Sequence, residues 1–308
     1  LAFGAPASFT GCGGGGTSGS PADDDDDGDG GGGGGPVSDC EGTPVGTDGF
    51  STQTMTVAGE SRDVSYYAPS SRGESPPLVI AFHGTSGSPA DWITGSDPSG
   101  IEALADDNCF VVAAPQARYM PDADWDHEGG GDVYWETTSS STATNEDLAL
   151  VEEVIEAAVA RYNINRNRIY TMGFSNGGFF SLLSAVAFRD EIAAFAEAGS
   201  GLVDCATTRS CVATSAATDC ATIAALCSCG SADKPVSLPT SGRLVPGFLG
   251  HNNRDDIVSS YYTCNLAARM QEAGYTYDVL IGDAEGHGFP EGYLIDAWDF
   301  LTQRTLPQ

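Results

Sequence analysis

The chain has 308 residues, of which 41% are apolar, and a formal net charge of −30 from 43 acidic and 13 basic side chains. This length is sufficient for one large domain or two small ones. The acidic balance argues against nucleic-acid binding, because that function requires a basic surface. Nine cysteines without a C-x-x-C pair are typical of an exported protein in an oxidising compartment, not of an intracellular enzyme.

The N-terminal end has the features of an export signal. We expect residues 1–11 to be the remnant of a signal peptide. The sequence Phe9-Thr10-Gly11-Cys12 resembles the cleavage box of bacterial lipoproteins, which makes Cys12 a candidate lipidation site. The alternative is a plain secretion signal with Cys12 free or disulfide-bonded. Both readings predict an extracellular or cell-surface protein, in contact with a membrane only through a lipid on Cys12.

Residues 12–48 are rich in glycine and aspartate and should form a flexible tether, because they cannot bury enough apolar surface to offset the entropy of ordering. The spacing of Asp23, Asp25 and Asp27 is similar to that of a calcium loop. Such a loop needs a glutamate at its twelfth position, where Gly34 stands, so we prefer a linker. The catalytic domain is then expected over residues 49–308.

The predicted elements of this domain begin with two alternating strands that should pair antiparallel. From residue 78 onward, buried apolar strands alternate with helices. The predicted strands are 52–57, 63–67, 78–82, 109–114, 168–172, 192–198, 244–249 and 276–281, and the predicted helices are 101–107, 146–162, 179–188, 258–273 and 291–301. This order predicts an α/β fold with a mostly parallel central sheet flanked by helices, and a site at the carboxyl ends of the strands.

Two segments interrupt this rhythm. Residues 116–141 are expected to form a long loop whose aromatic side chains, Trp125, Tyr134 and Trp135 among them, either line a substrate site or pack the loop onto the body. Residues 199–242 contain five cysteines and are expected to be an insertion held by disulfides. Zinc binding is the weaker alternative, because this segment has no histidine and its cysteine spacings do not fit. The pairing of the cysteines does not follow from the sequence.

A nucleophile motif lies between the predicted strand 168–172 and the helix 179–188. Gly173-Phe174-Ser175-Asn176-Gly177 fits G-x-S-x-G, in which a sharp strand-to-helix turn exposes a serine above the sheet. The alternative is an ordinary turn with a solvated serine. Because a serine hydroxyl is a weak nucleophile, Ser175 needs a base within hydrogen-bond reach.

The base and its acid should follow the serine along the chain. The order Ser, acid, His is that of α/β-hydrolases and selects His287, which lies in a glycine-rich loop after the last strand. The acid belongs on the loop after residues 244–249, where Asp255 is our first choice and Asp256 the alternative. The backbone N–H groups of Asn176 and Thr85 are expected to form the oxyanion hole. This chemistry requires no cofactor and no metal.

The same motifs resemble those of the extracellular α/β-hydrolase family that contains polyhydroxybutyrate depolymerases, feruloyl esterases and acetylxylan esterases. The resemblance covers about residues 50–305 and places the acid on Asp255. It rests on Phe82-His83-Gly84, on Asp147 with its helix, on Asn165 to Gly178, on His251 to Val258 and on Gly286 to Pro290. The sequence departs from the family at Asn252, where glycine is usual, and at Gly288-Phe289, where Thr or Ser with Trp is usual.

The resemblance implies an α/β-hydrolase fold, and the cysteine-rich insertion at about 199–242 is a further departure from the family. It also implies a secreted or surface-anchored serine carboxylesterase that acts on feruloyl or acetyl esters of plant polysaccharide. Three alternatives stay open at this point: a depolymerase of polyhydroxybutyrate-type polyesters, a peptidase of the same fold, and a non-catalytic polysaccharide-binding surface protein.

Overall fold

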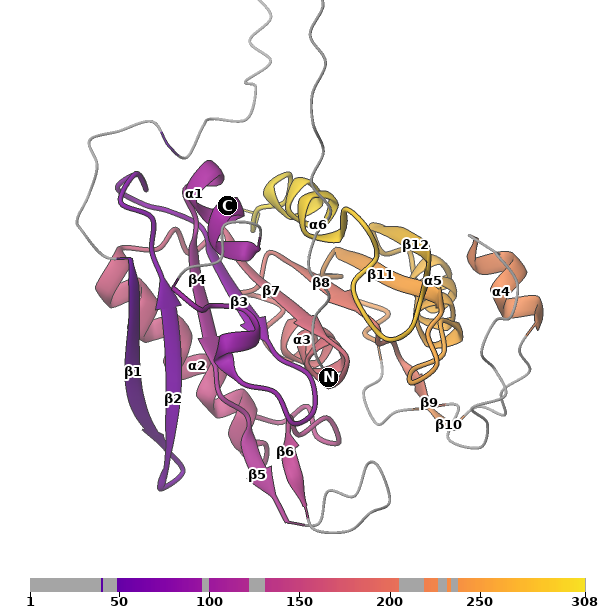
Figure 1. The fold of residues 1–308 in the computed structure, drawn as a ribbon, viewed down its shortest axis with the longest axis horizontal. Coiled ribbons are helices and arrows are strands. Elements are labelled where there is room, and N and C mark those ends of the chain that lie inside the picture. The colour runs from indigo at the N-terminus through magenta and orange to yellow at the C-terminus, as the bar shows by residue number, and fades with distance from the viewer. Residues whose placement is uncertain are drawn as a thin grey trace, which may run out of the picture. The chain divides into compact units, whose positions relative to one another are not determined.

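The computed structural model describes residues 40, 49–95, 100–121, 131–204, 219–226, 232–233 and 238–307 (Figure 1). They all belong to one structural unit, Pro36–Gln308. The predicted signal remnant, Cys12, most of the predicted tether and Trp125 lie outside the described residues.

An eight-stranded sheet forms the centre of the fold, with the strand order β1-β2-β4-β3-β7-β8-β11-β12. Its strands are β1 (Phe50–Val57), β2 (Glu60–Tyr67), β3 (Leu78–Phe82), β4 (Val111–Pro115), β7 (Ile169–Phe174), β8 (Ala194–Ala198), β11 (Gly247–Arg254) and β12 (Tyr277–Glu285). Only the pairs β1–β2 and β2–β4 are antiparallel, and every other neighbouring pair is parallel. The predicted, mostly parallel sheet is therefore confirmed.

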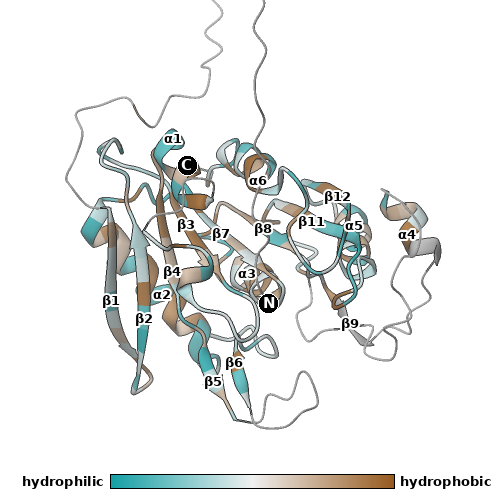
Figure 2. Cartoon of the chain, in the orientation of Figure 1, coloured by the Kyte–Doolittle hydropathy of each residue, from teal (hydrophilic) through white to brown (hydrophobic). Residues whose placement is uncertain are grey.

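Helices cover both faces of the sheet. The helices are α1 (Ile101–Asn108), α2 (Glu146–Tyr162), α3 (Asn176–Ala187), α4 (Cys220–Leu226), α5 (Tyr261–Ala273) and α6 (Tyr293–Thr302). Side chains of α2, α3 and α5 share one buried apolar cluster, whereas α1 and α6 contribute to a second. Along β3, Leu78, Ile80 and Phe82 belong to the first cluster and Val79 and Ala81 to the second, because successive strand residues face opposite sides. The central strands β3 and β4 are accordingly coloured as apolar in Figure 2.

The predicted helix ends agree closely with the structure where capping residues define them. The side chain of Asn145 accepts hydrogen bonds from the N–H groups of Asp147 and Leu148, which fixes the start of α2. Gly274 adopts a φ of 80° directly after α5, a conformation that glycine tolerates best.

Two elements differ from the prediction. The expected loop 116–141 contains a short antiparallel hairpin, β5 (Arg118–Met120) with β6 (Asp132–Tyr134). Strand β11 continues past residue 249 to Arg254, because its polar residues pair in parallel with β12 as far as Glu285. The apolar pattern did not predict this extension, because its residues are polar. The extension places His251 in the sheet, opposite Ile281 of β12.

Disulfides and short elements hold the remaining segments. Cys40 is bonded to Cys109, which directly follows α1, and Cys220 in α4 is bonded to Cys264 in α5. The predicted insertion thus has at least one covalent connection to the body. It also contains β9 (Val203–Asp204) and β10 (Ala232–Asp233), which pair with each other. Among the described residues, no helix combines the length and apolar composition needed to cross a bilayer.

Candidate active site

Ser175 lies at the junction of β7 and α3 and has the backbone geometry of a strained turn. Its φ is 56° and its ψ is −125°, values that a residue with a side chain rarely adopts. The N–H of Ser175 donates to the carbonyl of Ala198 at 2.8 Å, which ties the turn to β8. A Cβ on Gly173 would overlap the backbone of Gly177, so the turn can close only with glycine at residue 173.

His287 and Asp255 meet through a short hydrogen bond. Nδ1 of His287 lies 2.5 Å from Oδ2 of Asp255, whose side chain is fully buried. Oδ1 of Asp255 accepts from the N–H groups of Ile257 and Val258, both at 2.9 Å. Although burial works in the opposite direction, hydrogen bonds from His251 and His287 hold the pKa of Asp255 well below its usual range. The structure thus brings Asp255 to His287 and leaves Asp256 exposed.

The ring of His287 packs against the serine turn. Nε2 is buried and has no hydrogen-bond partner among the described residues. The imidazole packs on Phe174, the residue before Ser175, with ring centroids 4.6 Å apart. A Cβ on Gly199 would lie 3.0 Å from Cε1 of the same ring, so the small residue after β8 makes room for it. The His287 ring therefore lies against the residue that precedes Ser175, and its Nε2 has no partner among the described residues.

The loop after β3 also lies against the nucleophile. A Cβ on Gly84 would lie 3.3 Å from the Cβ of Ser175, so the segment that carries Thr85 lies against the serine. His83 anchors this loop. Its Nδ1 lies 2.7 Å from the carbonyl of Gly84, and its Nε2 accepts from the N–H of Ala117 at 3.0 Å. These partners make His83 a neutral ring, and burial lowers its pKa.

Trp135 supports both halves of the expected oxyanion hole. Its indole Nε1 donates to the carbonyl of His83 at 2.8 Å, and its backbone N–H donates to Oδ1 of Asn176 at 2.7 Å. The side chain is fully buried and stacks on Phe180. The expectation that Trp135 contacts substrate is therefore wrong: of the two alternatives for this loop, packing onto the body holds for Trp135. Tyr134 is only half-buried.

An aromatic wall of Phe174, Phe289 and Trp92 borders His287. The rings of Phe174 and Phe289 lie 4.8 Å apart, and those of Trp92 and Phe289 lie 5.5 Å apart. Phe289 is 40% exposed, whereas Trp92 is 6% exposed. A solvent-facing aromatic ring next to the base can receive an apolar part of a substrate. Neither Trp92 nor Phe289 is among the substrate-binding residues predicted from the sequence, although Phe289 stands where the resembling family usually has Trp.

A second layer of buried polar groups lies behind Asp255. Glu197, His251 and Thr263 are all fully buried, and burial raises the pKa of Glu197 from 4.5 to about 7. The sequence contained a signal for Glu197, because a single carboxylate stood in the predicted apolar strand 192–198. Strand β8 now places it in the interior.

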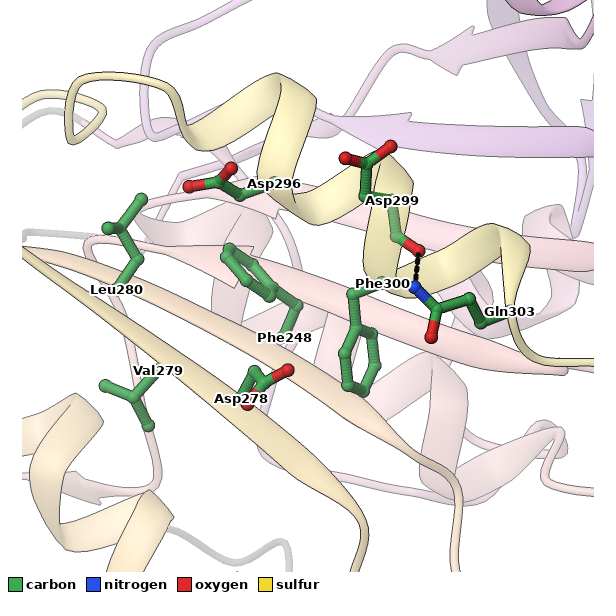
Figure 3. Close-up of a pocket in the computed structure, with 8 residues that line it drawn as sticks. All are labelled: Phe248, Asp278, Val279, Leu280, Asp296, Asp299, Phe300 and Gln303. Atoms are coloured by element: carbon green, nitrogen blue, oxygen red, sulfur yellow. Dashed lines mark hydrogen bonds between the residues drawn. The ribbon is translucent and has the colours of Figure 1, made fainter.

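One crevice of about 300 Å³ lies apart from these residues, between the edge of the sheet and α6 (Figure 3). Its lining combines aromatic and acidic side chains and includes none of the residues predicted to be catalytic. The lining residues are Phe248, Asp278, Val279, Leu280, Asp296, Asp299, Phe300 and Gln303.

The parallel sheet, the strained serine turn and the Asp255–His287 pair define an α/β-hydrolase fold. More narrowly, the chain belongs to the prolyl oligopeptidase family, whose sequence pattern matches residues 129–299. Two curated relatives show what else it resembles. A bifunctional acetylxylan esterase/xylanase of Neocallimastix patriciarum is 31% identical over 138 residues, which is 45% of this chain and 18% of the relative. Feruloyl esterase B of Thermothelomyces thermophilus is 24% identical over 127 residues, or 40% of this chain and 39% of the relative.

The chain therefore matches well under half the length of these two relatives. Among solved structures, acetyl xylan esterase from Aspergillus awamori matches 82% of this chain and 99% of its own, with a TM-score of 0.53 and 17% identity. At this identity the likeness concerns the fold alone.

Proposed function

We propose that the protein is a serine carboxylesterase that works through an acyl-enzyme. The observation that carries the proposal is the arrangement of His287: one nitrogen is bonded to Asp255, the other is buried without a partner among the described residues, and the ring packs on Phe174, the residue before Ser175. Asp255 would hold the imidazole in the tautomer that accepts a proton at Nε2. This geometry supports Ser175 as the nucleophile and His287 as the general base.

The reaction is the following. The Ser175 hydroxyl attacks the ester carbonyl carbon while Nε2 of His287 takes its proton. The N–H groups of Asn176 and Thr85 stabilise the resulting oxyanion, a contribution of about 10²–10³ in rate for each donor. The tetrahedral intermediate expels the alcohol, which receives the proton from His287. Water then attacks the acyl carbon while Nε2 of His287 takes a proton from it. The Ser175 oxygen leaves and receives that proton, which releases the acid and restores the enzyme.

For substrates we propose feruloyl or acetyl esters of plant polysaccharide. The similarity to a feruloyl esterase and to an enzyme with acetylxylan esterase activity supports this class. The aromatic wall with its exposed Phe289 favours an aromatic acyl group, because such a ring can stack on feruloyl but gains little from acetyl. A secreted or surface-attached enzyme suits an insoluble polysaccharide, and the cysteine content supports that location.

A fluorophosphonate probe tests the nucleophile. We expect the wild-type protein and a Ser140→Ala control to be labelled and Ser175→Ala to remain unlabelled, with hydrolysis of p-nitrophenyl acetate lost in parallel. Labelling that survives in Ser175→Ala would contradict the proposal. A binding protein without turnover would bind polysaccharide but react with neither reagent.

A substrate panel tests the acyl group. We expect kcat/KM for methyl ferulate to exceed that for a p-nitrophenyl acetate standard corrected for leaving-group reactivity, and we expect release of ferulate from feruloylated arabinoxylan. Faster release of acid from polyhydroxybutyrate or of amine from a peptide amide would move the assignment to a polyester depolymerase or a peptidase.

A further inference from the structure

A continuous chain of hydrogen-bonded side chains runs from Glu197 on β8 to Asp255 after β11. Oε2 of Glu197 accepts from the hydroxyl of Ser200, and Oε1 lies 3.3 Å from Oγ1 of Thr263 on α5. Oγ1 of Thr263 lies 2.7 Å from Nδ1 of His251, and Nε2 of His251 lies 3.3 Å from Oδ2 of Asp255. That oxygen is the same one that holds His287.

The partners of the two ring nitrogens of His251 indicate how many hydrogens the ring carries. Nε2 faces the carbonyl of Val258 at 2.9 Å and the ionised carboxylate of Asp255, which both only accept, so Nε2 must carry a hydrogen. Thr263 has one hydroxyl hydrogen, and it faces two acceptors for it, the carbonyl of Ser200 at 2.8 Å and Oε1 of Glu197 at 3.3 Å. Its oxygen can therefore meet Nδ1 at 2.7 Å only as an acceptor, so Nδ1 also carries a hydrogen.

We propose that His251 is a positioning residue held as a buried imidazolium between Asp255 and Glu197, and that it shares the charge of Asp255 with His287. This inference rests on the proposed function of the Asp255–His287 pair. A buried cation needs compensating negative charge, which Asp255 supplies on one side and Glu197 on the other through Thr263.

The groups that face Glu197 come from four elements: Ser200 after β8, His251 on β11, Thr263 on α5 and Tyr293 on α6. His251 is the only one of the four that brings a positive charge. Among these four groups only His251 can therefore compensate a charge on Glu197, whose pKa burial raises to about 7.

Nuclear magnetic resonance of the ring nitrogens tests the proposal without any turnover. The chain has four histidines, so the spectrum of protein labelled with ¹⁵N-histidine can be assigned with single His→Gln variants. At pH 8 we expect both ring nitrogens of His251 to show protonated shifts in the wild-type protein. In Glu197→Gln and in Thr263→Val, one of them should shift to the deprotonated range, whereas Thr263→Ser should behave as wild type. A singly protonated His251 in the wild-type protein, or an imidazolium unchanged in Glu197→Gln, would overturn the proposal.

The pH dependence of kcat/KM tests the connection to His287. With the cation lost, the whole charge of Asp255 stabilises protonated His287, so the acid limb should shift upward by about 0.5–1 pH unit in His251→Gln and in Glu197→Gln. The double variant should shift no further than His251→Gln alone, and additive shifts would overturn the connection. If His251→Gln does not fold, Glu197→Gln and Thr263→Val still give the result. An inactive wild-type protein with an imidazolium at His251 would contradict the proposed function but not the charge of His251.

Discussion

Asp255 and Asp256 are neighbours in the chain, but the fold gives them opposite environments. Asp255 is fully buried and bonded to His287, whereas Asp256 is exposed. Asp255 directly follows β11, and its N–H donates to the carbonyl of Asn252 at 3.2 Å. Two backbone N–H groups then fix one oxygen of Asp255 and leave the other for the histidines.

These environments make the two isosteric substitutions a matched pair. Asp255→Asn should lower kcat about 10³–10⁴-fold, because the amide can no longer select the productive tautomer of His287. Asp256→Asn should retain wild-type kcat. Steady-state hydrolysis of p-nitrophenyl acetate measures both, and equal losses in the two variants would contradict the assignment of the acid.

Glu197 couples the stability of the protein to pH. Its pKa is about 7 in the folded protein against about 4.5 when exposed, so the folded state binds more protons between these values and loses stability as pH rises through them. We expect the unfolding free energy of the wild type relative to Glu197→Gln to fall by up to about 3 kcal/mol from pH 4 to pH 8. Urea unfolding measures it, with Glu291→Gln as an exposed control. A difference that does not change with pH would contradict this linkage.

At the scale of elements, the loop after β3 and the hairpin β5–β6 depend on each other. The N–H of Ser86 donates to the carbonyl of Val133 at 2.9 Å, and Trp135 bonds the carbonyl of His83. Asp147 on α2 holds the same segment, because its carboxylate accepts from the N–H of Glu136 and from Arg62, both at 2.8 Å. The segment predicted as a loop therefore buttresses the expected oxyanion hole.

Trp135→Phe tests this dependence. The ring would still stack on Phe180, but the buried carbonyl of His83 would lose its donor, at a cost of about 1–3 kcal/mol in unfolding free energy. Because that loop carries the N–H of Thr85, we expect kcat to fall about 10-fold with little change in KM. Trp298→Phe, a buried control on α6, should lower stability without lowering kcat. An unchanged kcat in Trp135→Phe would contradict the idea that Trp135 supports the oxyanion loop.

For the whole molecule, disulfides join segments that are far apart in the chain. Cys40 and Cys109 are 69 residues apart, and their bond restricts the unfolded chain over that length. We expect Cys40→Ser/Cys109→Ser to lose about 2–4 kcal/mol of unfolding free energy and to retain kcat, because neither cysteine lies near the predicted catalytic residues. Urea unfolding at constant pH measures this, and a midpoint equal to that of the wild type would contradict it.

Local patterns were sufficient for the elements and for the candidate residues. Apolar runs gave the central strands, Asn145 and Gly274 marked helix ends, and G-x-S-x-G with the order Ser, acid, His selected Ser175 and His287. These features depend on residues close together in the chain, so they can be read without the fold.

Tertiary structure alone decided the rest. It bonded Asp255, already the first choice from the sequence, to His287, buried Trp135 instead of exposing it, and joined Glu197 to His251 across three elements. Each of these outcomes depends on contacts between residues distant in sequence and on whether water reaches a side chain. Neither property is encoded in a residue's own neighbourhood, because burial arises only when separate segments pack against one another.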